Sequence, residues 1–194
     1  MKKLNGSKKL KTSVFISGTG SNLKKLINFS FKKKSPIKIV LVVSSNKYAK
    51  GLIFSKKWKI DSKIYLYKNK IKSENKILKD LKKKKVELIC LAGFMKILSK
   101  NFIKKFKGKI LNIHPSLLPK YKGLNTHKKV IENNEKFSGC TVHLVNSKLD
   151  SGKIILQKKI RISKKDNYKT LKKKILKQEH LLYPKAIKKF ISNY

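Results

Sequence analysis

Residues 13–27 read SVFISGTGSNLKKLI, a short apolar run that passes through a glycine-rich turn into an amphipathic segment. After the turn, Leu23, Leu26 and Ile27 have the i, i+3, i+4 spacing of one helix face. The stretch therefore predicts a β-strand that ends in a tight turn and is followed at once by an α-helix. The two glycines of GTG permit such a turn and a close approach of the backbone to a ligand.

The glycine-rich turn has two interpretations. Ser21 and Asn22 are good N-cap residues, so in the first interpretation the turn starts a helix and has no further function. The N–H groups at the start of a helix that follows a parallel strand also bind anions. Leu23 stands where a dinucleotide-binding fingerprint has its third glycine, which argues against a dinucleotide. Taken alone, the stretch leaves the capped turn and the anion site equally open.

Short apolar runs rich in Val and Ile recur along the chain. They cover residues 13–17, 37–43, 87–92, 109–113, 140–145 and 153–160. Helical patterns separate the earlier runs, which is typical of parallel α/β folds. A hairpin or a long returning loop joins the last two runs, and the final segment, 167–192, predicts a helix that Pro184 kinks or divides. We expect an α/β fold with a Rossmann-like, mostly parallel twisted sheet and helices on both faces.

The length, composition and charge limit the classes of protein to which the chain can belong. The 194 residues suit one globular domain or two small ones, and 40% hydrophobic residues suffice for a core. A formal net charge of +43 suggests nucleic-acid binding, but Arg161 is the single arginine among 52 basic residues. Evolved phosphate and base recognition favours arginine, so we interpret the lysines, which are spread along the whole chain, as compositional bias. A positive field would still attract an anionic substrate.

Other sequence features point to a cytosolic protein. Cys90 and Cys140 lie in separate apolar runs, which predicts buried, reduced thiols rather than a metal site. The basic start, MKKLNGSKKLKT, is not followed by an apolar segment of signal-peptide length, and no run reaches the length of a membrane span. We therefore expect a cytoplasmic chain with no membrane partner.

Four motifs together carry a family resemblance. They are ISGTGSNL (16–23), LAGFMKILS (91–99), LNIHPSLLPKYKGLNTH (111–127) and HLVNSKLDSGKIILQ (143–157). Their order and spacing resemble those of the folate-dependent glycinamide ribonucleotide formyltransferases of purine synthesis. The resemblance implies the formyltransferase fold in a single domain, 13–194, after a basic extension, 1–12. It divides that domain into a phosphate-binding half, 13–108, and a catalytic and folate-binding half, 109–194.

The centre of the third motif suits formyl transfer on chemical grounds. An amine that attacks a formyl carbon generates an oxyanion, which needs hydrogen-bond donors, and a proton must move to the leaving nitrogen. Asn112 and His114 offer an amide and an imidazole on one side of an extended segment. They lie at the carboxyl end of an expected strand, where open α/β sheets bind ligands. A polar strand end with a structural histidine is the alternative that the two residues alone leave open.

The resemblance assigns roles that spacing alone does not. It implies that Asn112 and His114 stabilise the oxyanion, and that Asp150 holds the histidine, raises its pKa and supports proton relay through a water. It implies supporting positions at Thr141 and His143. The implied binding site for the phosphate and ribose of the nucleotide comprises Gly20, Ser21, Asn22, Gln178 and Glu179. The implied folate-binding residues are Met95, Lys96, Ile97, Leu98, Asn112, Asn146, Ser147, Lys148, Leu149 and Asp150.

Without reference to the resemblance, the periodicity of the last expected helix singles out Glu179. It falls on the apolar stripe of the last expected helix, with Leu171, Ile175 and Leu182. A carboxylate on such a stripe either reaches solvent at its margin or has a partner that offsets the cost of burial. His127 and His180 carry no firm role, and His127 can simply begin a helix.

The chain departs from the family pattern at three places. Lys96 stands where the family commonly has arginine, which removes a bidentate donor. Thr19 and Lys122 replace residues of the family's GNGSN and KYPG motifs, and we expect both replacements to be tolerated. A further folate-contacting residue is expected within residues 65–76 without an assigned position.

The resemblance implies a formyltransferase that takes 10-formyltetrahydrofolate as co-substrate and glycinamide ribonucleotide as acceptor, with no metal. We expect no specific nucleic-acid partner, and a monomer or weak homodimer. Three alternatives remain: a methionyl-tRNA formyltransferase, which typically carries an added C-terminal domain; a folate hydrolase, which typically carries an N-terminal regulatory domain; and a non-catalytic basic protein that binds nucleic acid. The last would leave all four motifs unexplained.

Overall fold

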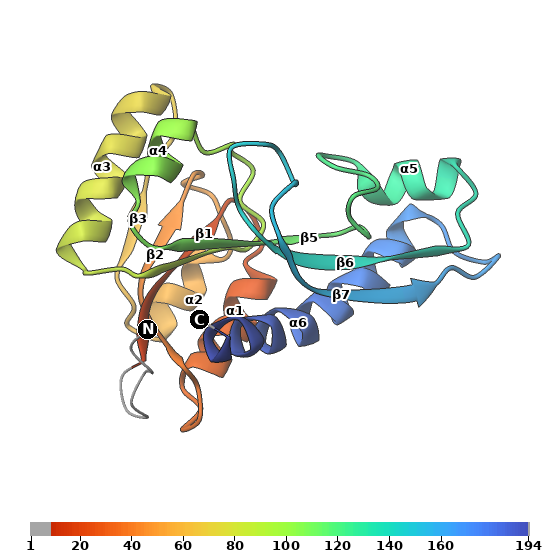
Figure 1. Ribbon diagram of the computed structural model, residues 1–194, viewed down its shortest axis with the longest axis horizontal. Helices are drawn as coiled ribbons and strands as arrows, with labels where there is room; N and C mark the ends of the chain where they lie inside the picture. Colours follow the sequence, from red (N-terminus) through yellow and green to blue (C-terminus); the bar gives the residue numbers. More distant parts are fainter. Residues whose placement is uncertain (1–8, 194) are drawn as a thin grey trace. The chain divides into compact units, whose positions relative to one another are not determined.

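The computed structural model describes residues 9–193, and the chain forms two compact units, Met1–Ile110 and Leu111–Tyr194 (Figure 1). The chain passes from the first unit to the second within strand β5 (Lys109–His114). The expected domain, 13–194, with its two halves remains a prediction. Residues 1–8 of the expected basic extension lie outside the described residues, whereas residues 10–12 belong to the first strand.

The first unit is built on four parallel strands. Their order is β3-β2-β1-β4, and their bounds are β1 (Leu10–Ile16), β2 (Ile37–Ser44), β3 (Ser62–Ile64) and β4 (Leu88–Leu91). The apolar runs of β1 and β4 are buried along their length because helices cover both faces of a parallel sheet. Strand β1 lies between β2 and β4 and leads into the glycine-rich turn, where Gly18 and Thr19 are exposed.

Helices lie on both faces of these strands, as the sequence predicts. They are α1 (Ser21–Ser30), α2 (Leu52–Lys57), α3 (Lys70–Lys83) and α4 (Lys100–Lys105). Figure 1 shows α1 and α2 on one face, and α3 and α4 on the other. Leu23, Leu26 and Ile27 are fully buried, so the apolar face that the spacing predicts is the face that packs.

The second unit holds strands β5, β6 (Phe137–Leu144) and β7 (Ile154–Arg161). Both neighbouring pairs are antiparallel, so the antiparallel part of the chain begins after the parallel strands. Helix α5 (Thr126–Glu132) contacts α6 (Tyr168–Ser192), and α6 packs on β6 and β7. Because β6 returns beside β5, it brings its own side chains next to the end of β5.

The α/β fold class is confirmed, with two differences in detail and one open alternative decided. The short strand β3 has no apolar run in the sequence, because all three of its residues are exposed. The hairpin expected near the C-terminus is β6–β7. Helix α6 runs through Pro184 without division, because its packing on the strands stabilises the whole helix.

The described residues bear on two further expectations. Cys90 and Cys140 are both buried thiols, as predicted. Within residues 9–193, no helix is both long and apolar enough to cross a membrane.

Candidate active site

The end of strand β5 places Asn112 and His114 on one side of the second unit. Strand β6 runs antiparallel beside it, and pairs Asn112 with His143 and His114 with Thr141. Directly opposed residues in such a ladder have side chains within contact distance. The strand pairing therefore assembles four polar side chains that the sequence separates by about thirty positions.

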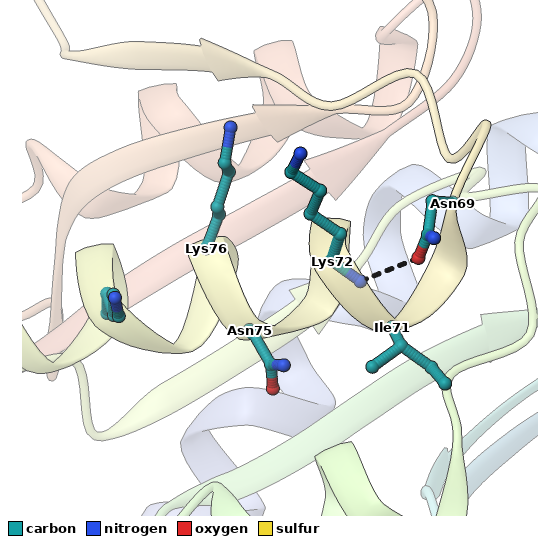
Figure 2. Close-up of a pocket in the computed structure, with 6 residues that line it drawn as sticks. Asn69, Ile71, Lys72, Asn75 and Lys76 are labelled. Carbon is teal, nitrogen blue, oxygen red and sulfur yellow. Dashed lines mark hydrogen bonds between the residues drawn. The ribbon is translucent and has the colours of Figure 1, made fainter.

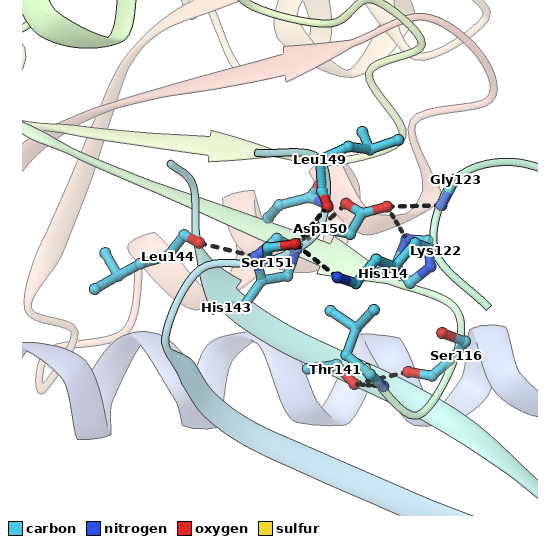
Figure 3. A network of polar contacts seen from close by, with 12 residues as sticks. His114, Ser116, Lys122, Gly123, Thr141, His143, Leu144, Leu149, Asp150 and Ser151 are labelled. Carbon is cyan, nitrogen blue, oxygen red and sulfur yellow. Dashed lines mark hydrogen bonds and ion pairs between the residues drawn. The ribbon is translucent and has the colours of Figure 1, made fainter. Parts of the chain in front are cut away.

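The His114 ring lies between a carbonyl and a carboxylate. Its Nε2 atom lies 2.8 Å from the carbonyl oxygen of Tyr121, and its Nδ1 atom lies 3.4 Å from Oδ2 of Asp150 (Figure 3). A carbonyl only accepts, so Nε2 carries the hydrogen and the lone pair of the neutral ring faces Asp150. Protonation of Nδ1 would pair the ring directly with the carboxylate.

Burial and charge act on His114 in opposite directions. Burial lowers the pKa of His114, while the Tyr121 carbonyl and the Asp150 charge raise it, and the net pKa lies below the ordinary value. The sequence predicts that Asp150 raises this pKa, and the carboxylate does act in that direction. Burial outweighs it because the side chain is only 6% exposed.

Asp150 is held as a charged carboxylate. Burial would raise the pKa of Asp150, but the His143 ring, the Gly123 N–H and the nearby His114 outweigh burial and lower it. The Gly123 N–H donates to Oδ2 over 2.9 Å, and Nε2 of His143 lies 3.6 Å from Oδ1. The residue itself has a φ of 45°, in the left-handed region that Asp tolerates better than most residues.

His143 orients the amide of Asn112. Nδ1 of His143 lies 2.8 Å from the carbonyl of Leu144, so it carries the hydrogen and leaves a lone pair on Nε2. In the neutral ring that lone pair faces Nδ2 of Asn112 at 3.2 Å and gives no hydrogen to Asp150. A hydrogen on Nε2 would point to the Asp150 carboxylate instead, and that form of His143 is the one that lowers the Asp150 pKa. An amide nitrogen has two hydrogens, so Asn112 keeps a second donor for a ligand while its orientation is fixed.

Thr141 fixes the loop that supplies the Tyr121 carbonyl. The Thr141 hydroxyl donates to the Ser116 carbonyl over 2.7 Å and accepts from the Leu118 N–H at 3.1 Å. The Ser116 hydroxyl in turn donates to the carbonyls of Lys120 and Tyr121. Thr141 thus holds the backbone of this loop, and its supporting role in the reaction stays a prediction.

The contacts that hold His114 and Asp150 include groups that sequence reasoning missed. The Tyr121 carbonyl and the Gly123 N–H are backbone groups, which carry no signature in the side-chain pattern. Lys122 is a departure from the family motif that we expected only to be tolerated. Its Nζ donates to the Ser151 hydroxyl over 2.7 Å, so it links the loop after β5 to the loop that carries Asp150.

The last helix carries the remaining predicted residues of the second unit. Glu179 is buried on the inner face of α6, as the periodicity predicts, and Gln178 beside it is half-buried. Burial, and then the charge of Glu179, raise the pKa of the Cys140 thiol to about 12. Helix α6, which carries Glu179, packs on β6. Burial, then Lys172 and His114, lower the pKa of His127 to about 4, which leaves it neutral near pH 7.

In the first unit, the glycine-rich turn differs in one respect from the expectation. The N-cap residue is Gly20, with a φ of 71° and no side-chain cap, and Ser21 is the first helical residue. The expected capping by Ser21 or Asn22 is therefore wrong, because the left-handed turn at Gly20 starts the helix one residue earlier. Asn22 is buried, and Ser21 is half-buried.

Gly20 approaches the protein's own backbone. A Cβ at Gly20 would lie 2.4 Å from the Cα of Gly51, whereas a Cβ at Gly18 would meet nothing within 4 Å. The Gly51 N–H also donates to the Gly18 carbonyl over 3.0 Å. Gly20 is thus required by internal packing, and Gly18 faces open space.

The segment after β4 presents apolar side chains outward. Met95 and Ile97 are each 65% exposed, Lys96 is exposed, and Leu98 is buried. In the second unit, the loop of residues 146–149 is likewise exposed, and the Lys148 N–H donates to the Asn146 side chain over 2.9 Å. Both segments offer backbone groups beside exposed apolar surface, which suits a flat ring with a polar edge.

A hollow lies on the first unit away from the residues described above. Figure 2 shows a hollow on the outer side of α3, lined by Asn69, Ile71, Lys72, Asn75, Lys76 and Lys79. Across residues 9–193, no group of three or more His, Cys, Asp or Glu side chains could hold a metal ion. Independence from metal stays a prediction.

Comparison with known proteins matches this arrangement to a class of enzyme. A family model described as formyl transferase matches residues 10–187. The chain therefore belongs to the formyl transferase family.

Two similar proteins that match over most of their own length are named for one activity. The chain is 42% identical over 183 residues to the phosphoribosylglycinamide formyltransferase of Haemophilus influenzae, covering 93% of this chain and 86% of the relative. The crystal structure of phosphoribosylglycinamide formyltransferase from Brucella melitensis matches with a TM-score of 0.89 and 40% identity, over 95% of this chain and 96% of that one.

A trifunctional purine biosynthetic protein, adenosine-3, of Gallus gallus is 43% identical over 182 residues. That match covers 92% of this chain but only 18% of the longer relative. The chain thus spans about a fifth of the trifunctional proteins it matches.

Proposed function

We propose that this chain transfers the formyl group of 10-formyltetrahydrofolate to the amine of glycinamide ribonucleotide. The products are the N-formyl nucleotide and tetrahydrofolate, a step of de novo purine synthesis. The observation that carries the proposal is the His114 ring, held between the Tyr121 carbonyl and the Asp150 carboxylate, two residues along the strand from Asn112. The names of the relatives supply the acceptor and the formyl transfer, and the resemblance of the four motifs supplies the folate donor.

The second unit's residues suit each requirement of the reaction. The amine nitrogen forms a bond to the formyl carbon, the bond from that carbon to the folate nitrogen breaks, and a proton passes from the amine to that nitrogen. The tetrahedral intermediate carries an oxyanion. The second N–H of Asn112 donates a hydrogen bond to it, and the positive charge of the protonated His114 ring stabilises it electrostatically. Asp150 favours the protonated ring and supports the relay of the proton.

The nucleotide substrate needs a phosphate site and a ribose site. In the first unit, we assign the phosphate to residues 20–22, because the start of α1 has no side-chain cap and follows a parallel strand. In the second unit, we assign the ribose hydroxyls to Glu179 and Gln178. A buried carboxylate is a strong acceptor for two adjacent hydroxyl groups.

The folate co-substrate needs an apolar surface beside backbone donors and acceptors. We assign the pterin ring to residues 95–98 of the first unit and to residues 146–150 of the second. The exposure of Met95, Ile97 and Leu149 supports this assignment. Lys96 provides a point charge where the family commonly has an arginine fork, so it contributes attraction without bidentate geometry.

We further propose that the chain acts in the cytoplasm, as a monomer or weak homodimer without a nucleic-acid partner. Analytical ultracentrifugation tests the oligomeric state. Binding of tRNA that falls steeply with salt, together with formylation of charged initiator tRNA, would instead favour the tRNA-specific alternative.

The function is tested by assay of the purified chain with both substrates. We expect formation of tetrahydrofolate that requires glycinamide ribonucleotide, and loss of that activity in His114→Ala. Absence of turnover by the unaltered chain, or full activity in the variant, would overturn the proposal.

A further inference from the structure

Glu74 is a buried carboxylate that the proposed reaction does not use. It is one of nine acidic residues in the chain and is only 3% exposed. It lies on the inner face of α3 with Ile77 and Leu81, whereas the residues drawn in Figure 2 lie on the outer face. A charge removed from water is costly unless hydrogen bonds offset the loss of hydration.

Both carboxylate oxygens of Glu74 accept hydrogen bonds from one residue. The Ser99 N–H donates to Oε1 over 2.9 Å, and the Ser99 hydroxyl donates to Oε2. The same hydroxyl accepts from the Phe102 N–H at 3.0 Å and so caps α4. Ser99 directly follows residues 95–98, so Glu74 fixes the point where this segment ends.

The other end of the segment is fixed by different groups. The Ser17 N–H donates to the Gly93 carbonyl over 3.1 Å, and the Met95 N–H donates to the Ser17 hydroxyl over 2.8 Å. The Phe94 ring packs edge-on against Phe15, with ring centroids 5.3 Å apart. The outward-facing segment is therefore anchored at both ends.

A cap for α4 alone does not require a buried charge. The Ser99 hydroxyl supplies the cap by itself, as Ser does at many helix starts. The Glu74 carboxylate adds a second constraint, because it fixes both the backbone N–H and the side chain of Ser99. Such a constraint is expected where the position of a backbone edge matters for a ligand.

We propose that Glu74 is a positioning residue for folate binding, which holds the backbone of residues 95–98 in the conformation that meets the pterin edge. This inference rests on the proposed function, since it takes the pterin to bind at this segment. Glu74 acts through Ser99 and does not touch the substrate.

The test compares three substitutions. Glu74→Ala removes both acceptors, and Glu74→Gln keeps one acceptor and offers an N–H to the Ser99 hydroxyl. Asp80→Asn is the matched control, because Asp80 also lies on α3 but accepts from the Tyr65 hydroxyl. The measurements are kcat, the KM of each substrate, the melting temperature, and the affinity for tetrahydrofolate by calorimetry.

We expect Glu74→Ala to raise the KM for 10-formyltetrahydrofolate by about tenfold or more, the scale of one hydrogen bond to a charged group. The KM for glycinamide ribonucleotide should change less than about twofold, and Glu74→Gln and Asp80→Asn should stay near the unaltered protein. If Glu74→Ala does not fold, Ser99→Ala, which keeps the N–H bond, should show a smaller rise in the same KM.

Two results would overturn the inference. One is a folate KM unchanged by both Glu74→Ala and Ser99→Ala. The other is an equal rise in both KM values that follows the loss of melting temperature, which is the signature of a helix cap alone. If the unaltered chain shows no turnover but binds tetrahydrofolate in a Glu74-dependent way, the proposed function fails and the positioning role stands.

Discussion

Oδ2 of Asp150 lies 3.4 Å from Nδ1 of His114, on the side of the ring away from the Tyr121 carbonyl. Neutral His114 thus presents a lone pair to a carboxylate, and protonated His114 would present a hydrogen to it. The Asp150 charge raises the pKa of His114 and so favours the charged ring, whereas burial lowers that pKa. The pKa of such a ring changes when either the burial or the facing carboxylate is altered.

The first prediction concerns the charge of Asp150. Asp150→Asn keeps the shape of the side chain and an acceptor for the Gly123 N–H, and Asn tolerates the φ of 45°. We expect kcat to fall by about 10²–10⁴-fold, the range of general acid–base contributions, with small changes in both KM values. Steady-state kinetics checks this, and full activity of the variant would contradict it.

The same variant has an expected pH signature. If the protonated ring is required, kcat decreases as the pH rises through the pKa of His114. Asp150 raises that pKa, so in Asp150→Asn the decrease should move to lower pH. An unmoved pH profile of kcat would mean that the two groups are not coupled in the reaction.

The second prediction concerns His143, the acceptor that orients Asn112. His143→Leu removes the acceptor, so the amide is free to rotate, and kcat should fall by about 10–100-fold while both KM values change little. His143→Gln can return an acceptor and should recover part of the loss. If the two variants lose kcat equally, the orienting bond does not contribute to catalysis.

The sequence predicts this site only in part, for physical reasons. The i, i+2 spacing places Asn112 and His114 on one side of β5 because alternation in a strand is a local property. The approach of Asp150 depends on how the chain returns after β6, and it is held by a backbone N–H at Gly123. Spacing could not predict that Asp150 lies beside His114, whereas the resemblance to a family did. Neither predicted the contact with the Gly123 N–H.

The fold shows the same division between local and non-local information. Long apolar runs predict β1, β2 and β4, because burial on both faces leaves a signal in the residues themselves. Strand β3 leaves none, because it is an exposed edge strand of three residues. The role of Glu74 cannot be predicted from the sequence for a related reason. Its partner, Ser99, is 25 residues away, and no local pattern links the two residues.

The third prediction separates the two glycines of the opening turn. Gly20→Ala places a Cβ 2.4 Å from the Cα of Gly51 at a φ of 71°. Strain and overpacking should lower the free energy of unfolding by roughly 2–4 kcal/mol. Gly18→Ala meets nothing within 4 Å and should leave stability unchanged. Urea denaturation of both variants checks this, and equal stability would contradict the close approach.

The last prediction concerns stability in acid, where His127 is the main group. Its pKa is lowered from 6.5 to about 4 by burial, then by Lys172 and His114. Between these values the unfolded chain binds more protons than the folded chain. The contribution of His127 is therefore fully present above about pH 6.5 and is lost as the pH falls toward 4.

We expect the free energy of unfolding to fall across this window, with His127 contributing up to about 1.4 kcal/mol per pH unit. His127→Gln should flatten the slope but not abolish it, because burial also lowers the pKa of His114, which acts with the same sign. Lys172→Gln should flatten the slope less, because it removes only one cause of the His127 shift. Urea denaturation at several pH values measures the slope, and an unaltered slope in His127→Gln would show that this ring is not buried as a neutral group.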